Sequence, residues 1–187
     1  MKKLPIICCL LILAALLVPG CEVENCPPNA LSYLHFSLVD QNGRSFNTSD
    51  TITIVGQTST DATVYDTLAD GSLQPHTVST VVSDTLINRE TAASSFSIPL
   101  SYNAYTQFIF YYYSLSRSFA GCDTIRITHR NIPYFTNLDC GTMMFYEITD
   151  VQHTHHRLDS LVVTNPNIDN NEKENIQIYF TVTGTAE

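Results

Sequence analysis

The chain has 187 residues, is 44% hydrophobic and carries a formal net charge of −9. That length suits one domain with a substantial apolar core. An acidic chain of this kind lacks the clustered cations that displace counterions from nucleic acid, so we expect no nucleic-acid partner.

The first 20 residues have the pattern of a bacterial lipoprotein signal peptide. Two lysines precede an apolar run from Leu4 to Val18. Its length of about 15 residues matches a signal-peptide core, whereas a membrane-spanning helix needs about 20. Gly20 stands directly before Cys21, as in a lipobox. We therefore predict cleavage before Cys21, acylation of that cysteine and attachment to the outer membrane through the lipid. Pro19 is unusual within a lipobox, and the alternatives are an ordinary secretory signal or an uncleaved anchor.

The remaining sequence divides into a tether and one domain. Residues 21–30 form a short lipidated tether, in which Pro27 and Pro28 argue against a helix start. Residues 31–187 form a single β-sandwich domain, because no composition shift or internal repeat marks a further boundary.

Threonine, valine, isoleucine and tyrosine dominate this domain, and no stretch shows sustained helical periodicity. Turn signals such as Asn42-Gly43 and Asp70-Gly71 separate short apolar segments. We predict an all-β fold, namely an antiparallel, immunoglobulin-like two-sheet sandwich, with a lipocalin-type barrel as the alternative. The predicted strands are residues 32–39, 51–56, 62–68, 77–87, 95–100, 106–115, 123–130, 142–154, 159–164 and 175–183.

The cysteines of an exported chain lie in an oxidising compartment. Beyond Cys21 the mature chain keeps Cys26, Cys122 and Cys140, so at most one disulfide forms within it. If strands at 123–130 and 142–150 form a hairpin, Cys122 and Cys140 lie at opposite ends of it. They are then more than about 20 Å apart and out of disulfide reach. We predict a Cys26–Cys140 disulfide and a buried free thiol at Cys122.

His153, His155 and His156 form a cluster with ligand-like spacing. In a strand, His153 and His155 share a face about 7 Å apart, close enough to clamp a metal ion with a third ligand. His156 points to the other face, and no acidic or cysteine partner stands at a position that would pair with them. We expect polar alternation on a solvated strand face, with no metal and no cofactor.

The densest aromatic run is Phe108–Tyr113. Alternation places Phe108, Phe110 and Tyr112 on one face of a strand, and Tyr111 and Tyr113 on the other. Tyr111 and Tyr113 are candidate ligand-binding residues, because exposed aromatic rings offer a stacking platform for a sugar or peptide. The alternative is a central strand that is buried on both faces.

Motifs of the common hydrolases do not occur. The sequence has no Gly-x-Ser-x-Gly, no HExxH and no Ser-x-x-Lys. We therefore predict a protein that is not an enzyme, with a hydrolase of dispersed active site as a third-ranked alternative.

Asp-Ser/Thr-aliphatic triplets occur more often than the roughly one that composition predicts. The triplet resembles the O-glycosylation acceptor of exported Bacteroidota proteins, in which the hydroxyl carries the glycan. The alternative is a turn aspartate that precedes a β-strand. The candidate acceptors are Thr51, Thr67, Thr85, Thr124 and Ser160.

A set of short motifs near the lipobox and in the second half of the chain carries a family resemblance. These motifs are Cys26-Pro27-Pro28, Asp123–Arg130, Asp139-Cys140-Gly141, Phe145–Thr149, Leu158–Leu161, Asn165-Pro166 and Asn175–Phe180. Together they resemble a family of uncharacterised Bacteroidota lipoproteins that is defined by a domain of unknown function. The resemblance implies export, lipidation and an all-β body, and it fits Cys26 and Cys140 as disulfide partners. It implies no activity.

These observations lead to a functional expectation. We expect an outer-membrane-anchored lipoprotein that acts as a non-catalytic binding or accessory subunit of an outer-membrane protein complex. A lipid tether supports this reading, because it raises the effective concentration of a membrane partner and lets a modest interface suffice. The alternative is a surface lipoprotein that binds a glycan or peptide through Tyr111 and Tyr113.

Overall fold

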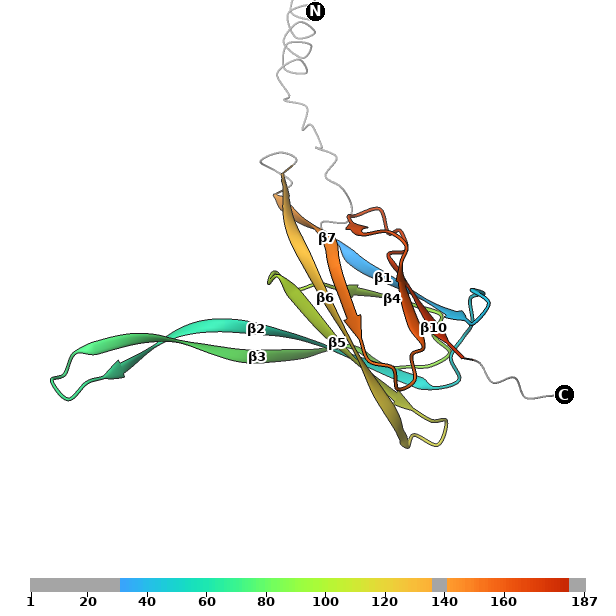
Figure 1. The fold of residues 1–187 in the computed structure, drawn as a ribbon, viewed down its shortest axis with the longest axis horizontal. Coiled ribbons are helices and arrows are strands. Elements are labelled where there is room, and N and C mark those ends of the chain that lie inside the picture. Colours follow the sequence, from blue (N-terminus) through green and yellow to red (C-terminus); the bar gives the residue numbers. More distant parts are fainter. Residues whose placement is uncertain (1–30, 136–140, 182–187) are drawn as a thin grey trace, which may run out of the picture.

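The computed structural model describes residues 31–135 and 141–181 of the chain. Within these residues, ten β-strands form two sheets that pack face to face (Figure 1). None of the described residues forms a helix long and apolar enough to cross a membrane. The strands are β1 (Tyr33–Asp40), β2 (Thr51–Thr67), β3 (Leu73–Glu90), β4 (Ser95–Pro99), β5 (Tyr105–Tyr113), β6 (Phe119–Phe135), β7 (Thr142–His153), β8 (Ser160–Val163), β9 (Asn167–Ile168) and β10 (Ile176–Phe180).

The smaller sheet has the strand order β4-β1-β10-β8. β1 and β10 run parallel, with Phe36 opposite Ile176, and the other neighbours run antiparallel. The burial of β1 alternates along the strand, so that Leu34, Phe36 and Leu38 face the core.

The larger sheet has the strand order β3-β2-β5-β6-β7-β9, and all its neighbouring strands are antiparallel. β6 and β7 form a long hairpin, in which Ile125 pairs with His153 at one end and Phe135 pairs with Thr142 at the other. Three of its five pairs, β2–β3, β5–β6 and β6–β7, join strands that are consecutive in sequence, because antiparallel neighbours need only short connections.

The core lies between the two sheets. The Phe36 ring meets the rings of Phe108 and Phe110 edge-on, with centroid distances of 6.0 and 5.9 Å. All three side chains are fully buried. Aromatic pairs in this geometry add to the free energy gained by burial, so truncation of Phe36 to alanine would cost about 3–5 kcal/mol.

The distal part of the β2–β3 hairpin leaves the sandwich and projects into solvent (Figure 1). β5 pairs with β2 as far as Gln57, and beyond that point β2 and β3 pair only with each other. We call residues 58–82 the arm. From residue 60 to residue 82 every residue is exposed.

The predicted two-sheet sandwich is confirmed, and its sheets do not close into a barrel. The predicted hairpin of segments 123–130 and 142–150 is also present. The segments 51–56 and 62–68 were expected to be separate strands, but both belong to β2. The strand continues because no glycine, proline or asparagine lies between Gly56 and Asp70 to turn the chain.

Candidate functional site

The arm presents two faces and two free edges. Side chains alternate between the two faces of a strand. One face of the arm therefore carries the even-numbered side chains of β2, a row that begins in the core with Ile52 and Ile54. In the arm this row and its cross-strand partners include Ala62 opposite Val78 and Thr58 opposite Val82. Val78 and Val82 are 39% and 49% exposed. This face therefore extends the core-facing side of β2 into solvent, with polar residues such as Thr60 and His76 among its valines.

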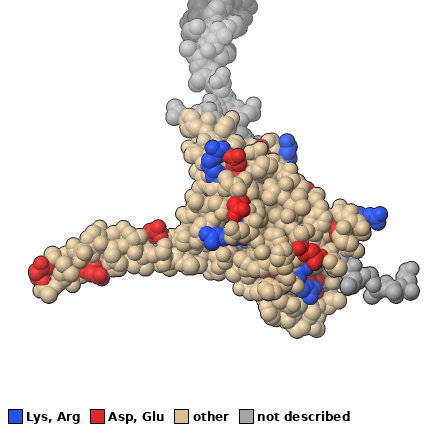
Figure 2. Space-filling model, viewed as in Figure 1, with Lys and Arg blue, Asp and Glu red and all other residues tan. Residues whose placement is uncertain are grey.

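The arm is acidic. It contains Asp61, Asp66 and Asp70, and no lysine or arginine occurs between Arg44 and Arg89. Figure 2 shows red patches along the arm and no blue ones on the face in view. The charge of the arm is therefore complementary to neutral or basic surfaces rather than to acidic ones.

Asp123 fixes the turn that follows β7. Its side chain is 1% exposed. The Oδ1 atom accepts hydrogen bonds from Thr154 Oγ1 and the His156 N–H, both at 2.7 Å. The Oδ2 atom accepts from the N–H groups of Arg157 at 2.8 Å and Leu158 at 3.0 Å. Burial raises the pKa of Asp123, but these donors lower it by more, so the carboxyl titrates below its ordinary range.

A polar pocket of about 440 Å³ lies beside this turn. Arg157 forms an ion pair with Asp50 at its rim, and the Arg157 guanidinium lies 5.9 Å from the ring centroid of Tyr112. The buried Tyr112 hydroxyl has no hydrogen-bond partner among the described residues. Asp123 is near, but its four acceptor sites are occupied. Burial and the Asp123 charge raise the pKa of Tyr112 far above its ordinary value.

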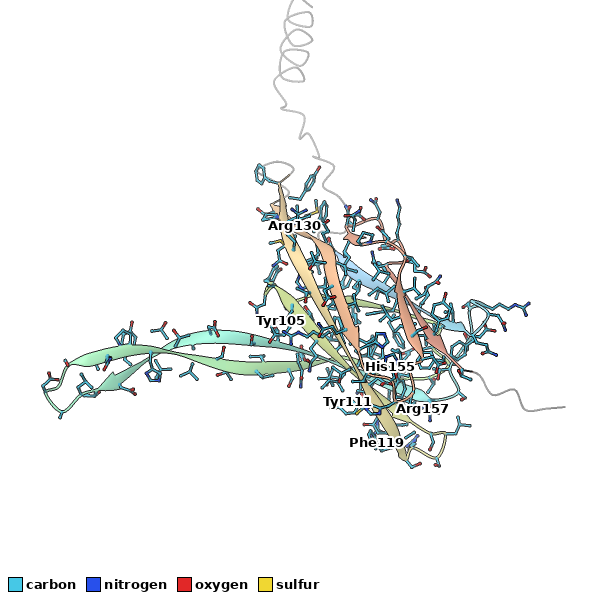
Figure 3. The ribbon with its side chains drawn as sticks, viewed as in Figure 1. Tyr105, Tyr111, Phe119, Arg130, His155 and Arg157 are labelled. Atoms are coloured by element: carbon cyan, nitrogen blue, oxygen red, sulfur yellow. The ribbon has the colours of Figure 1, made fainter. Side chains whose placement is uncertain are left out.

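The aromatic run divides between the two faces of β5 as predicted. Phe108, Phe110 and Tyr112 are buried, and Tyr111 and Tyr113 are half-buried on the outer face of the larger sheet. Phe119, from the start of β6, lies against both tyrosines, with ring centroids 6.5 Å from Tyr111 and 6.1 Å from Tyr113. Figure 3 places Tyr111 and Phe119 together at one end of the sheet.

The histidine cluster is split by the end of a strand. β7 ends at His153, so His155 lies in the following turn, and the two rings approach to a centroid distance of 4.3 Å. The N–H of His156 is bound to Asp123. In the described part of the chain, no three residues among His, Cys, Asp and Glu gather so as to hold a metal ion.

The predicted sites at Cys21, Cys26 and Cys140 lie outside the described residues, so acylation and the disulfide stay predictions. Cys122 is a free thiol. It is half-buried rather than buried, because alternation turns Asp123 toward the core and leaves Cys122 on the outer face opposite Tyr111.

The five candidate glycosylation acceptors differ in exposure. Thr67, Thr85 and Ser160 are exposed, whereas Thr51 and Thr124 are half-buried. Four of the preceding aspartates have partners within the fold: Asp50 binds Arg157, Asp66 binds His76, Asp123 binds the turn after β7, and Asp159 accepts a hydrogen bond from Thr181. Modification of the five hydroxyls stays a prediction.

The arm and the Asp123 turn were not predicted from the sequence. The signal for the arm was the uninterrupted run of β-forming residues after Gly56. The signal for Asp123 was a carboxylate on the same strand face as Ile125 and Ile127, which are both fully buried.

Comparison with known proteins identifies a family but no activity. No curated protein and no solved structure matches the chain. A family model described as a family of unknown function (DUF6452) matches residues 76–180, from β3 in the arm to the end of β10. The matched range takes in β5, Phe119 and Asp123, and it covers more than half of the chain. The chain therefore belongs to this family of unknown function.

Proposed function

We propose that this chain is a non-catalytic lipoprotein, anchored to the outer membrane through Cys21, that serves as an accessory subunit of an outer-membrane protein complex. The arm, residues 58–82, is the surface that docks onto the partner. The observation that carries this proposal is the arm itself, a β-ribbon that leaves the sandwich and is exposed on both faces from residue 60 to residue 82.

The stability of a free ribbon supports a docking role. A two-stranded hairpin is marginally stable in water, because it has no third element against which to bury apolar side chains. Tyr65 and Val81 are 59% and 67% exposed in the arm. Contact with a partner would remove this apolar surface from water and would stabilise the ribbon.

The edges of the arm support strand addition as the mode of contact. Proteins usually protect a free edge with lysine, proline or a β-bulge. The arm contains Pro75 but no lysine, and its pairing from Val55 to Thr67 runs without a bulge. An edge of this kind accepts a strand from another chain through backbone hydrogen bonds. The acidic residues of the arm favour a partner strand with neutral or basic side chains.

Site-specific photo-crosslinking in intact cells tests the docking surface. Crosslinkers at Val64 and Val78, both partly exposed on the arm, should give one reproducible adduct with an outer-membrane protein. A crosslinker at Thr149, which is exposed on β7, serves as the matched control and should give none. Replacement of residues 61–79 by Asn-Gly should abolish co-purification of that membrane protein. Equal adducts from the arm and from Thr149, or a homodimer as the sole arm adduct, would refute the proposal.

The anchor is tested separately. The Cys21→Ser variant should lose metabolic labelling by palmitate and move from the membrane to the soluble fraction, with an unchanged circular dichroism spectrum. Retention in the membrane without acylation would refute the lipid anchor and leave the arm experiment interpretable.

A further inference from the structure

A small pocket on the outer face of the larger sheet is lined by two arginines. It has a volume of about 180 Å³ and is formed by Thr51, Arg89, Thr91, Tyr113 and Arg117. Within residues 31–135 and 141–181, neither the Arg89 nor the Arg117 guanidinium has an ion-pair partner. In an acidic chain, two unpaired cations at one pocket favour an anion.

Both arginines occupy backbone conformations that favour glycine. Arg89 has φ of 54° at the bulge near the end of β3, and Arg117 has φ of 63° in the turn between β5 and β6. In that turn the Arg117 N–H donates to the Ser114 carbonyl at 2.7 Å. Left-handed conformations are costly for residues with a Cβ, and they concentrate at functional sites. Two such positions from different hairpins supply side chains to the same pocket.

The Tyr113 ring forms the wall next to the arginines, and Phe119 packs against that ring just outside the pocket lining. The Arg89 guanidinium carbon lies 5.8 Å from the centroid of the Tyr113 ring. The Phe119 ring packs against Tyr113 and is 61% exposed. An apolar wall of this size beside a guanidinium suits a ligand that has a flat apolar face next to its charge.

We propose that this pocket binds the carboxylate-bearing ring of an acidic saccharide, such as a uronic acid, independently of docking by the arm. Arg89 and Arg117 hold the carboxylate, because planar guanidinium groups match its geometry. Tyr113 stacks against the C–H face of the sugar ring, Phe119 beside it extends this apolar surface, and Thr51 and Thr91 face the hydroxyls of the sugar. The pocket volume suits one pyranose ring, so the site binds a single acidic sugar residue of a glycan.

Isothermal titration of the full chain with tri-galacturonic acid tests the site. We expect saturable binding that weakens as salt concentration rises. The Arg117→Gly variant should weaken binding at least tenfold, and Phe119→Ala should do the same. Glycine suits the backbone at position 117, so loss of binding in that variant cannot be attributed to misfolding.

Two controls make the outcome decisive. Arg130→Ala removes the same charge far from the pocket, near the other end of β6 (Figure 3), and should bind as the parent does. The trisaccharide with its carboxylates converted to amides should not bind. The proposal is overturned if tri-galacturonic acid does not bind, if Arg117→Gly binds it unchanged, or if inorganic phosphate competes as well as the trisaccharide.

Discussion

The Asp123 carboxylate accepts a hydrogen bond from the Leu158 N–H at 3.0 Å, which joins the inside of β6 to the turn after β7 across 35 positions of sequence. Leu158 itself is 1% exposed and belongs to the core. This contact therefore anchors both a buried apolar side chain and the turn that carries Arg157 to the pocket beside Tyr112.

The Asp123→Asn substitution should destabilise the protein by about 3 kcal/mol at pH 7, because an amide cannot accept all the hydrogen bonds that the carboxylate accepts. Urea denaturation monitored by circular dichroism measures the change. Asp84→Asn is the matched control, since Asp84 is an exposed member of another triplet, and it should change the stability by less than about 0.5 kcal/mol. Equal effects of the two substitutions would contradict the role of Asp123.

The same carboxylate gives the stability a defined dependence on pH. The donors around Asp123 lower its pKa in the folded state below its unfolded value. Its contribution is therefore complete above the unfolded pKa of about 3.9 and is lost as the pH falls through the folded pKa. The stability difference between the parent and Asp123→Asn should shrink below about pH 4, when both are unfolded by urea at a series of pH values. A difference that stays constant down to pH 2 would show that ionisation of Asp123 does not matter.

The Tyr112→Phe substitution should leave the protein as stable as the parent or stabilise it by about 1 kcal/mol. The buried Tyr112 hydroxyl has no partner among the described residues, and an unpaired buried hydroxyl opposes folding. Urea denaturation of both proteins tests this. Destabilisation by more than about 1 kcal/mol would indicate that the hydroxyl is hydrogen-bonded in solution.

Shortening the arm should leave the sandwich intact. Replacement of residues 61–79 by Asn-Gly keeps the Thr60–Thr80 pair and the contacts of Ser59 with Asn103 and Tyr105. Asn-Gly suits a two-residue hairpin turn. The melting temperature should change by less than about 4 °C, which corresponds to about 1 kcal/mol in a domain of this size. A larger fall would mean that the arm contributes to folding, and its exposure would then need another explanation than docking.

The Arg117→Gly substitution should stabilise the protein by about 0.5–1 kcal/mol, because it relieves a left-handed conformation at the cost of some chain entropy. Ala92→Gly is a comparison without a charge, since Ala92 has φ of 53°, and it should behave similarly. Thermal unfolding measures both. A gain in stability together with loss of tri-galacturonic acid binding would show that the arginine is retained for its side chain.

Glycopeptide mapping of the protein purified from the cells that produce it should find modification at Thr67, Thr85 and Ser160, which are exposed. Thr51 and Thr124 are half-buried and should be modified less. Bare hydroxyls at all five positions would refute the glycosylation hypothesis.

Local patterns explain which parts of the fold were predictable. The alternation of Phe108 and Phe110 with Ile109 and Tyr111 is a property of neighbouring residues, so it predicted both faces of β5. The length of β2 depends instead on where turn residues are missing, and two short strands were expected where the chain runs straight through Gln57 into the arm.

Contacts between distant residues explain what was missed in the candidate site. The hydrogen-bond partners of Asp123 lie more than 30 positions away in the sequence. Arg89 and Arg117 line the same pocket because the bulge that carries one and the turn that carries the other adjoin in space. Neither the bulge nor the turn contains the glycine that usually marks a left-handed residue, so neither could be predicted from local residue patterns.

The parallel pairing of β1 with β10 has a consequence for the order of assembly. β1 lies between β4 and β10, so one of its edges stays open until residue 180 has left the ribosome. The smaller sheet therefore depends on a pairing between the first and the last strands of the described residues, and long-range pairing of this kind slows folding.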